Sequence, residues 1–208
     1  MIRFSISISL LMVTLTAHAA SRQKTVPVVL CLGDSLTEGY EISPDAAFPA
    51  LLDQKLKEKF GPEAQAINAG ISGATSASGE GRLKFQLKAT KKPTHMILAL
   101  GANDGLRGLP VAEMKKNLET TIKLAKSSGI KVLLAGMKVP PNYGAGYAKS
   151  FEATFKTVAR EQQVSLIPFL LDGVAANAKL NLDDGIHPNP AGHKILVETV
   201  WNKLEPML

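Results

Sequence analysis

Short runs of aliphatic and β-branched residues alternate along the chain with longer segments in which apolar residues recur at helical spacing. Most of the short runs are almost continuously apolar, as strands are when helices cover both faces of their sheet. This alternation is typical of an α/β domain built on a parallel sheet. The runs that we interpret as strands are Val28–Leu32, Ala64–Asn68, Met96–Leu100, Val132–Ala135 and Val164–Ile167.

Four of the longer segments carry a single apolar face, which predicts helices that pack on this sheet. Local signals support two of them, because Gly61-Pro62 ends the first helix, and Pro110 opens the second before Gly129 ends it. The apolar positions are Phe48, Leu51, Leu52, Leu56 and Phe60; Val111, Met114, Leu118, Ile122 and Ala125; Tyr147, Phe151, Phe155 and Val158; and Ile195, Leu196, Val200 and Leu204.

Connections between parallel strands of one sheet are right-handed in nearly all proteins. With the order of the elements, this rule predicts a three-layer α/β/α sandwich, a flavodoxin-like five-stranded parallel sheet with strand order 2-1-3-4-5. Ligands bind beyond the carboxyl ends of the strands in such sheets. We therefore expect functional residues in the segments that directly follow the strands.

The first residues of the chain have a different pattern. Arg3 precedes an apolar stretch from Ile6 to Leu15, and Ala17-His18-Ala19 offers a small-x-small cleavage site. The stretch is shorter than the ~20 residues that cross a bilayer, which favours a secretory signal over a membrane anchor. We expect residues 1–19 to be cleaved, residues 20–208 to form one domain, and the protein to be exported to the periplasm or secreted without stable membrane insertion.

The charge balance leaves the kind of partner open at first sight. The chain has 24 Lys and Arg against 18 Asp and Glu, a formal net charge of +6, and such an excess is compatible with nucleic-acid or anionic-membrane binding. The lysines, however, are scattered over helical segments without interleaved aromatic residues, so we interpret them as a solvated surface and expect no nucleic-acid partner. The single cysteine, Cys31, cannot form an internal disulfide, so packing alone must hold the domain.

A serine follows the first predicted strand, in Gly33-Asp34-Ser35. Glycine permits the tight turn from strand to helix, and the N–H groups at a helix start carry partial positive charge that would face a developing oxyanion. Serine is also a common helix N-cap after a strand. This segment alone therefore leaves both a nucleophile and a cap as interpretations.

A carboxylate and an imidazole stand three residues apart near the end of the chain, at Asp184 and His187. One loop can hold both, with Asp184 accepting from one ring nitrogen while the other nitrogen takes a proton from a serine. Taken alone, the segment suits equally well a turn in which aspartate and glycine serve the backbone geometry.

Two further polar segments follow predicted strands, with Gly73 in the first and Asn103 in the second. A glycine N–H and an asparagine amide are neutral donors of the kind that an oxyanion hole requires. Because these segments and the serine all lie at strand carboxyl ends, we expect them to converge on one cleft that the late histidine loop completes.

The remaining histidines give little support for a metal site. His193 follows His187 by six residues, but zinc sites use three or four protein ligands and no third ligand stands at suitable spacing. His95 precedes a strand, where we expect it to be capping or exposed. The segment Gly70–Gly79 lacks a phosphate-loop or dinucleotide pattern, so neither a metal nor another cofactor is expected.

The order of the motifs carries more information than any one of them. The blocks Gly33-Asp34-Ser35-Leu36, Ile71-Ser72-Gly73, Asn103-Asp104-Gly105-Leu106-Arg107-Gly108, Pro141-Asn142-Tyr143-Gly144 and Asp184-Gly185-Ile186-His187-Pro188 occur in this sequence. Together they resemble the GDSL-type, or SGNH, hydrolases over nearly the whole mature chain. Within that family they are similar to the bacterial exported acyl thioesterase, arylesterase and lysophospholipase branch.

The resemblance implies the SGNH hydrolase fold and a role for each matching residue. Ser35 would be the nucleophile, His187 its base and Asp184 the residue that orients the base. The oxyanion donors would be Ser35, Gly73 and Asn103. Two positions depart from the pattern of the branch, because Ala74 and Ala102 stand where aspartate and glycine are common. Neither change removes a catalytic group, so we expect tuning and not loss of activity.

The implied reaction is hydrolysis of small carboxylic esters or thioesters with short to medium acyl chains. We expect the segments Gly105–Pro110 and Val139–Tyr147 to form an apolar acyl groove, although their side chains would also suit packing on neighbouring helices. The substrate contacts that we predict are Leu106, Leu109, Tyr143 and Ile186. A carbohydrate or peptidoglycan O-acetylesterase with the same catalytic groups is the alternative, and a non-catalytic binding domain is disfavoured by the intact set of these groups.

Overall fold

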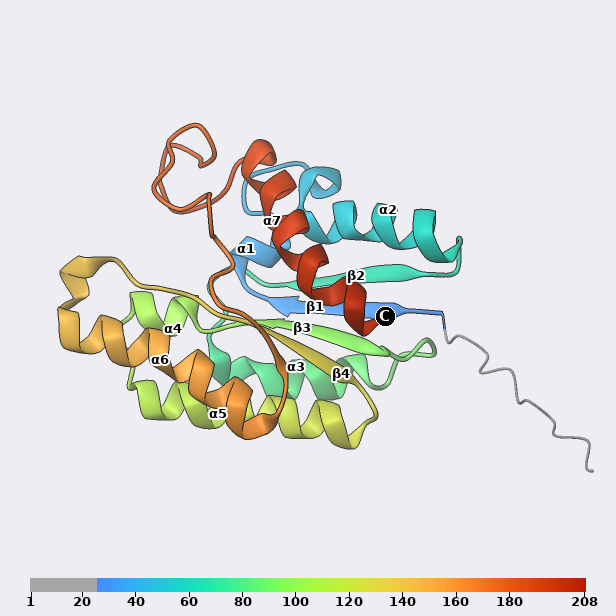
Figure 1. Ribbon diagram of the computed structural model, residues 1–208, viewed down its shortest axis with the longest axis horizontal. Coiled ribbons are helices and arrows are strands. Elements are labelled where there is room, and N and C mark those ends of the chain that lie inside the picture. Colours follow the sequence, from blue (N-terminus) through green and yellow to red (C-terminus); the bar gives the residue numbers. More distant parts are fainter. Residues whose placement is uncertain (1–25) are drawn as a thin grey trace, which may run out of the picture.

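The computed structural model describes residues 26–208, except for the side chain of Pro141. The predicted signal, residues 1–19, lies outside the described residues. Five parallel strands form one sheet in the order β2-β1-β3-β4-β5, and helices cover both of its faces (Figure 1). The predicted three-layer sandwich and its strand order are thus confirmed.

The strand ends differ from the predicted ones by at most two residues. β1 and β3 at the centre are buried along their whole length, which explains their continuous apolar character. β2 lies at the edge of the sheet and is only partly buried. The strands are β1 (Val28–Gly33), β2 (Gln65–Gly70), β3 (His95–Ala99), β4 (Lys131–Ala135) and β5 (Ser165–Ile167).

The predicted helices form two groups. α2 (Phe48–Phe60) and α7 (Pro190–Leu204) lie together on one face of the sheet, and α5 (Val111–Ser127) and α6 (Ala145–Gln162) lie on the other (Figure 1). The short elements, which the periodicity did not mark, are α1 (Ser35–Glu38), α3 (Gly79–Gln86), α4 (Ala102–Leu106) and the 3-10 turns η1 (Pro44–Ala46), η2 (Ser76–Ser78), η3 (Pro141–Tyr143) and η4 (Glu205–Met207).

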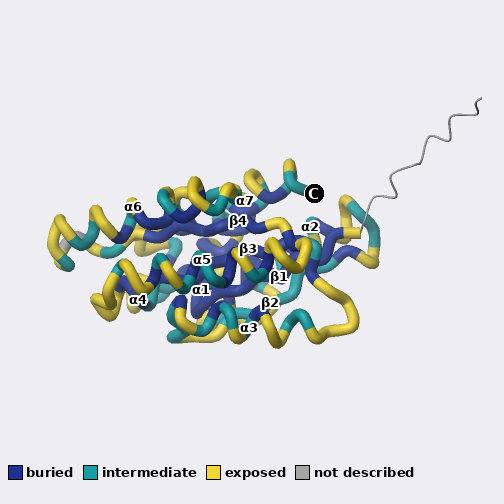
Figure 2. Tube along the Cα trace, turned by 90° about the horizontal axis from the view of Figure 1, so that it is seen from below, coloured by how far each residue is buried: buried dark blue, intermediate teal, exposed yellow. Residues whose placement is uncertain are grey.

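The core lies between the sheet and the inner faces of these helices, where the buried segments run along the strands (Figure 2). Phe48 of α2 fills one side of the sheet, while Phe151 and Phe155 of α6 fill the other. Cys31 in β1 is fully buried, and this burial raises the pKa of its thiol far above the ordinary value. The thiol therefore acts as a small apolar side chain and not as a nucleophile.

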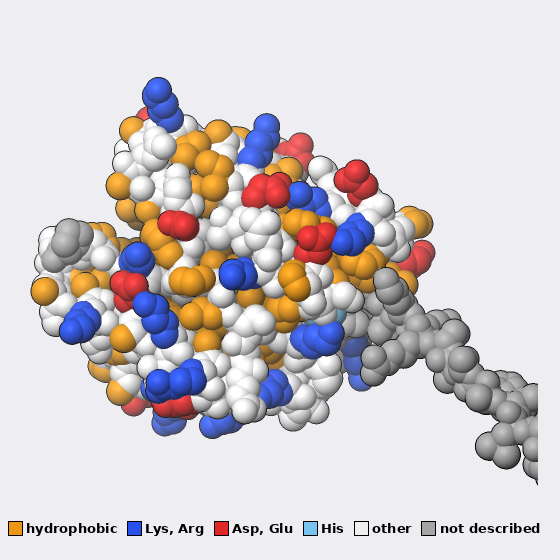
Figure 3. Space-filling model, viewed as in Figure 1, with side chains coloured by type: hydrophobic (Ala, Val, Ile, Leu, Met, Phe, Trp, Pro, Cys, Tyr) orange, Lys and Arg blue, Asp and Glu red, His pale blue; other side chains and the backbone are white. Residues whose placement is uncertain are grey.

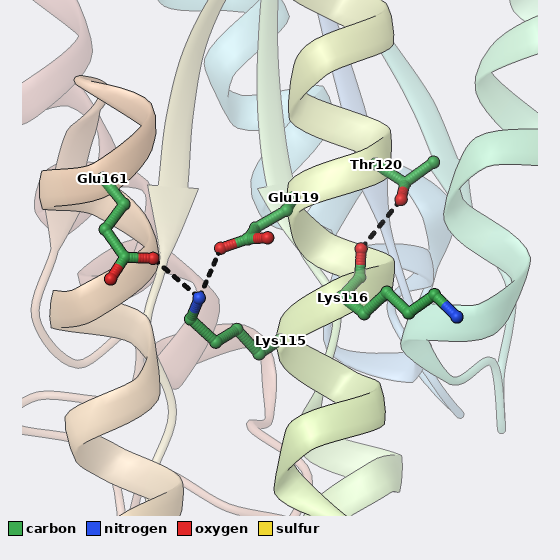
Figure 4. Close-up of polar contacts among 5 residues, drawn as sticks. All are labelled: Lys115, Lys116, Glu119, Thr120 and Glu161. Atoms are coloured by element: carbon green, nitrogen blue, oxygen red, sulfur yellow. Dashed lines mark hydrogen bonds and ion pairs between the residues drawn. The ribbon is translucent and has the colours of Figure 1, made fainter.

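Ion pairs organise part of the outer surface. Lys115 of α5 lies with its Nζ 2.7 Å from Oε1 of Glu119 and 2.6 Å from Oε2 of Glu161 on α6, so one lysine links the two helices (Figure 4). Beside it, Oγ1 of Thr120 donates to the carbonyl of Lys116. Hydrogen bonds to both carboxylates raise the pKa of Lys115. The paired lysine agrees with a solvated basic surface.

None of the helices between residues 26 and 208 has the length and apolarity that crossing a membrane requires.

The carboxyl ends of β1, β2 and β3 carry the loops with the predicted functional residues at one edge of the sheet. The loop between β5 and α7 approaches the same edge (Figure 1).

Candidate active site

Ser35 is the first residue of α1, and only the N-cap residue Asp34 separates it from the end of β1. Oδ1 of Asp34 caps this helix by accepting the N–H of Leu36 at 3.1 Å. A Cβ at Gly33 would lie 1.9 Å from Oγ1 of Thr37, so the close approach of helix and strand requires glycine there. The first N–H groups of a helix have no partner within it. The N–H of Ser35 is therefore positioned to bind an anion beside its own hydroxyl.

His187 lies between Ser35 and Asp184. Its Nε2 is 3.0 Å from Oγ of Ser35, and its Nδ1 is 2.6 Å from Oδ2 of Asp184. An ionised carboxylate can only accept, so the proton between Asp184 and His187 belongs to Nδ1. In the neutral ring Nε2 is then the acceptor that faces the serine hydroxyl. Residues 152 positions apart in the chain thus form one hydrogen-bonded series.

Asp184 is held in its ionised form. Partial burial favours the neutral acid, but hydrogen bonds from the His187 ring and from the backbone N–H groups of His187 and Ile186 outweigh this effect and lower the pKa of Asp184 to about 2. The carboxylate is therefore charged throughout the range in which imidazoles titrate. It can fix the ring orientation and stabilise the ring when it carries a proton.

Gly73 and Asn103 border the same space as Ser35 and His187. Gly73 has φ +75°, and within residues 26–208 its backbone N–H has no hydrogen-bond acceptor. Nδ2 of Asn103 donates to the carbonyl of Ala74 at 3.1 Å. Since an amide NH₂ group carries two hydrogens, one remains for another acceptor. Both residues can therefore present N–H groups to a substrate oxygen.

The loop that carries Gly73 is held from two sides. Glu38 of α1 accepts the backbone N–H of Ser72 at 2.7 Å and also its hydroxyl. Arg107, at the end of α4, donates from Nη2 to the carbonyl of Gly73 at 2.9 Å. Neither contact was predicted, although Arg107 stands inside one of the sequence blocks named above and Glu38 lies two residues beyond another. The donor loop is thus fixed to the helix that bears the serine and to the helix that bears Asn103.

Asp104 fastens α4 to the segment that follows the donor loop. Its buried carboxylate accepts the backbone N–H of Ser76 at 2.7 Å and the Ser76 hydroxyl at 2.6 Å. Nδ2 of Asn117 on α5 donates to the same hydroxyl at 3.1 Å. This network fixes the distance between the loop of Gly73 and the helix of Asn103.

The two departures from the family pattern fit their surroundings. Ala74 takes part through its backbone, because its carbonyl accepts from Asn103 and its N–H donates to the carbonyl of Ile71 at 3.1 Å. Ala102 begins α4, and the glycine that takes a positive φ, of +121°, is Gly101 before it. An alanine at position 102 therefore causes no left-handed strain beside Asn103.

A cavity of about 560 Å³ opens at this edge of the molecule. On the face drawn in Figure 3 the surface is hollowed between an upper and a left-hand lobe, with apolar side chains around the hollow. Its lining includes Ser35, Gly73, Asn103 and His187, and Asp184 stands behind His187. The other lining residues are Leu36, Tyr40, Ser72, Ala102, Leu106, Met137, Lys138, Val139, Pro140, Phe169, Leu171, Ala175, Ala176, Asn181, Gly185 and Ile186.

The predicted substrate contacts divide into two groups. Leu106 and Ile186 line the cavity, whereas Leu109 and Tyr143 do not. The hydroxyl of Tyr143 donates to the carbonyl of Leu106 at 2.8 Å, and that of Tyr147 donates to the carbonyl of Leu109 at 2.9 Å. Both tyrosines thus support the segment that carries the leucines. Val139 and Pro140, from the predicted segment Val139–Tyr147, also line the cavity, whereas sequence reasoning did not indicate the walls formed by Met137, Lys138, Phe169 and Leu171.

The other two histidines within residues 26–208, His95 and His193, have structural roles. Nδ1 of His193 accepts the backbone N–H of Phe48 at 3.1 Å and so caps α2, whose own N-cap residue, Ala47, provides no side-chain hydrogen bond. Burial lowers the pKa of His193 to about 4. His95 is not exposed, contrary to one of the two expectations, because it begins β3 as a buried residue; its Nε2 lies 3.0 Å from the carbonyl oxygen of Met207 at the end of η4.

Comparison with known proteins supports the architecture and an ester-hydrolysing activity. The GDSL-like Lipase/Acylhydrolase family profile matches residues 31–195. The chain is 38% identical over 199 residues to esterase TesA of Pseudomonas aeruginosa, with 96% of each chain covered. It is 40% identical over 176 residues to an arylesterase of Vibrio mimicus, covering 85% of this chain and 87% of that protein.

Two further similarities extend this result. The chain is 36% identical over 199 residues to thioesterase 1/protease 1/lysophospholipase L1 of Escherichia coli K12, with 96% of this chain and 91% of that protein covered. The crystal structure of TesA superposes with a TM-score of 0.82 at 39% identity, covering 87% of this chain and 99% of that chain. The fold is therefore that of the SGNH hydrolases. The chain belongs to the GDSL-like lipase/acylhydrolase family, and it is a carboxylic ester hydrolase.

Proposed function

We propose that this esterase hydrolyses esters and thioesters of short to medium acyl chains through a Ser-His-Asp triad and an acyl-enzyme on Ser35. The observation that carries the proposal is the continuous series from Oγ of Ser35 through His187 to Oδ2 of Asp184, with contacts of 3.0 and 2.6 Å. Geometry of this kind activates a serine, because the base is in hydrogen-bonding reach and is itself oriented.

In the acylation half of the reaction, Oγ of Ser35 attacks the acyl carbon while its proton passes to Nε2 of His187. The carbonyl oxygen becomes an oxyanion, which would accept hydrogen bonds from the N–H groups of Ser35 and Gly73 and from the amide of Asn103. The bond to the leaving alcohol or thiol then breaks. The leaving group takes the proton from Nε2, and the acyl group stays on Oγ of Ser35.

Deacylation repeats these steps with water as the nucleophile. The water oxygen attacks the acyl carbon and gives a proton to Nε2 of His187. The bond between the acyl carbon and Oγ of Ser35 breaks, and Oγ regains its proton from Nε2 as the carboxylic acid leaves. Asp184 stays ionised in both halves and stabilises the ring whenever it is positively charged.

The acyl-chain preference is inferred from the cavity. Leu106, Val139, Phe169 and Ile186 give it largely apolar walls beside Ser35, and apolar walls favour an alkyl chain through burial. The relatives named esterase, arylesterase and thioesterase support both an ester and a thioester as substrate. A methyl group alone would leave most of about 560 Å³ unfilled, which argues against an acetyl-only specificity.

The test is a chain-length series of aryl esters and acyl thioesters, with O-acetylated sugars as a further substrate. We expect turnover of both acyl series, little turnover of the acetylated sugars, and loss of activity in Ser35→Ala. Ser150→Ala, which removes an exposed serine hydroxyl from α6, is the control and should match the wild type. An active Ser35→Ala variant would refute the proposal. A preference for acetylated sugars would mean that the substrates are O-acetylated carbohydrates and not esters and thioesters of longer acyl chains.

We also propose that residues 1–19 direct export and that the mature protein begins at Ala20, in the periplasm or outside the cell. Expression of the full chain in a bacterium, followed by N-terminal sequencing of the protein from the periplasmic fraction, tests this. An N-terminus at Ala20 is expected. Protein that keeps residues 1–19 and remains in the cytoplasm would contradict it.

A further inference from the structure

Tyr40 contacts the ring of His187. The two ring centroids are 4.5 Å apart and the ring planes are tilted by 35°. Ser35 and Asp184 occupy the two nitrogens of the imidazole, so Tyr40 contacts it through a ring face and not through a hydrogen bond. Tyr40 is 37% exposed and lines the cavity, which leaves it accessible while it covers the base.

The backbone around Tyr40 is built to present this side chain. Gly39 ends α1 with φ +88°, and Glu41 takes φ +55°, which is unfavourable for a residue other than glycine. Between them, the N–H of Tyr40 donates to the carbonyl of Ser35 at 3.2 Å. The turn therefore ties the position of the Tyr40 ring to the residue whose hydroxyl faces His187.

An aromatic face suits this position for an electrostatic reason. The ring face of tyrosine carries partial negative charge, and it attracts a cation that lies within about 6 Å of the ring centre. His187 becomes such a cation when it takes a proton from Ser35. Hydrogen bonding to Glu41 raises the pKa of the Tyr40 hydroxyl, so the phenol stays neutral around neutral pH.

Two carboxylates interact with the His187 ring, while Lys138 lines the same cavity and Arg82 interacts electrostatically with Asp34. Asp184 accepts from Nδ1, and the buried carboxylate of Asp34, beside Ser35, interacts with the ring electrostatically. Glu41 follows Tyr40 in the chain and interacts with its hydroxyl. Tyr40 adds to these groups an uncharged aromatic contact with the ring.

We propose that Tyr40 is a positioning residue for His187: its ring holds the imidazole between Ser35 and Asp184 and stabilises the imidazolium. This inference rests on the proposed function, because it requires His187 to be the base. It differs from a role as a wall for the substrate, which the place of Tyr40 in the cavity would also permit. A positioning role affects kcat and the pH–rate profile, whereas a wall affects KM.

Steady-state kinetics of Tyr40→Leu, Tyr40→Phe and Phe85→Leu test the proposal. We expect Tyr40→Leu to lower kcat about tenfold, with KM changed less than about threefold, because the ring of His187 loses its fixed plane. The acid limb of kcat/KM should move to lower pH by about half a unit as the charged ring loses its aromatic contact. Tyr40→Phe should recover most of the rate. Phe85→Leu alters an aromatic side chain that is 72% exposed and outside the cavity, and it should match the wild type.

Several outcomes would overturn the inference. One is that Tyr40→Leu leaves both kcat and the acid limb of kcat/KM unchanged, and another is that it changes only KM. A third is that the acid limb moves to higher pH, which would mean that Tyr40 only shields the His187 ring from water. Thermal unfolding establishes that each variant is folded, and Tyr40→Met replaces Tyr40→Leu if the latter does not fold. Ser35→Ala separates the two proposals. If Ser35→Ala is inactive while Tyr40→Leu behaves like the wild type, only the role of Tyr40 fails; if Ser35→Ala stays active, the proposed function itself fails.

Discussion

Asp184 holds His187 through two separate hydrogen bonds, since Oδ2 lies 2.6 Å from the ring Nδ1 and Oδ1 accepts the backbone N–H of the same residue at 3.0 Å. A carboxylate that binds both the ring and the backbone of one histidine restricts the rotation of that side chain. The orientation of His187 toward Ser35 is therefore set within a four-residue segment, and only the approach of this segment to α1 depends on the rest of the fold.

The first prediction concerns pH. The pKa of Asp184 is about 2, so this carboxylate stays ionised in mild acid and cannot cause a loss of activity there. Protonation of the His187 ring can, because a charged imidazole does not accept the serine proton. We expect kcat/KM to fall as the solution is acidified, because a smaller fraction of the enzyme then has a ring that can accept this proton. A flat profile would exclude histidine as the essential base.

Asp34 provides the control for this experiment. Burial raises the pKa of its carboxyl to about 6, against the opposing effect of its hydrogen bonds, so it changes charge in mild acid. Asp34→Asn removes this titration and keeps an acceptor for the N–H of Leu36. The fall in kcat/KM should persist in Asp34→Asn. Its disappearance would assign the titration to Asp34 and not to His187.

The second prediction concerns the oxyanion donors. Removing one donor from an oxyanion hole lowers kcat by about 10²- to 10³-fold, and we expect a loss of this size in Asn103→Ala. Since Asn103 also holds the carbonyl of Ala74, Asn117→Ala serves as the control, because it removes only a supporting bond to Ser76. We expect less than about a tenfold loss there, because that side chain supports the loop without facing a substrate oxygen. Equal losses in both variants would mean that Asn103 acts only by fixing the loop.

The sequence predicts those elements whose burial produces a recognisable pattern of apolar residues. β1 and β3 are buried throughout, so their apolar runs mark them clearly. β2 is half-buried at the edge and continues to Gly70 through residues that resemble a loop. The short helix α3 contains Gly79 and Gly81 and has no apolar stripe. Its stability comes from packing against neighbours, which periodicity does not report.

The residues of the candidate active site also divide into predictable and unpredictable ones. Residues at strand ends were predictable, because a parallel sheet brings its carboxyl ends together. The residues that hold them were not, because contacts such as those of Glu38 with Ser72 and Arg107 with Gly73 join positions 34 residues apart. Tyr143 is a different case. Its aromatic character suggested a substrate contact, but its hydroxyl supports the backbone of Leu106 from outside the cavity lining.

The third prediction separates two exposed leucines of one segment. Leu106 lines the cavity and Leu109 does not, although their exposure is nearly the same, at 39% and 37%. Leu106→Ala should shift the chain-length profile, lowering kcat/KM most for the acyl chains that reach this wall. The expected factor is about 10 per substrate, from the lost apolar contact. Leu109→Ala should leave the profile unchanged. Identical profiles for both variants and the wild type would remove Leu106 from the acyl groove.

The fourth prediction concerns stability and His193. Its pKa falls from 6.5 to about 4 on burial, so between these values the unfolded chain binds a proton that the folded chain does not. Stability from this residue is therefore complete above about pH 6.5 and decreases as the pH falls to 4, by about 3 kcal/mol at most. Between pH 7 and pH 5, the melting temperature of His193→Asn should fall less than that of the wild type. If the melting temperature of His193→Asn fell as much as that of the wild type, the proposed contribution of His193 to acid sensitivity would be contradicted.

The contribution of Asp34 to stability changes with pH in the opposite direction, so the stability of an Asp34 variant must be measured in the same experiment. Its pKa rises from 3.8 to about 6 on folding, so the folded chain binds the extra proton and gains stability as the pH falls through this range. The two residues therefore compensate each other in the wild type. Asp34→Asn should become more sensitive to acid than the wild type, while His193→Asn becomes less sensitive.

The central claim is that Ser35 is the nucleophile and that His187 activates it. Reaction of the purified protein with an alkyl phosphonate that carries a good leaving group, followed by peptide mass spectrometry, tests this directly. The account predicts a single phosphonate adduct on Ser35 that forms in step with the loss of esterase activity, and much slower labelling in His187→Ala. An adduct on another residue, or complete inactivation with Ser35 unmodified, would contradict it.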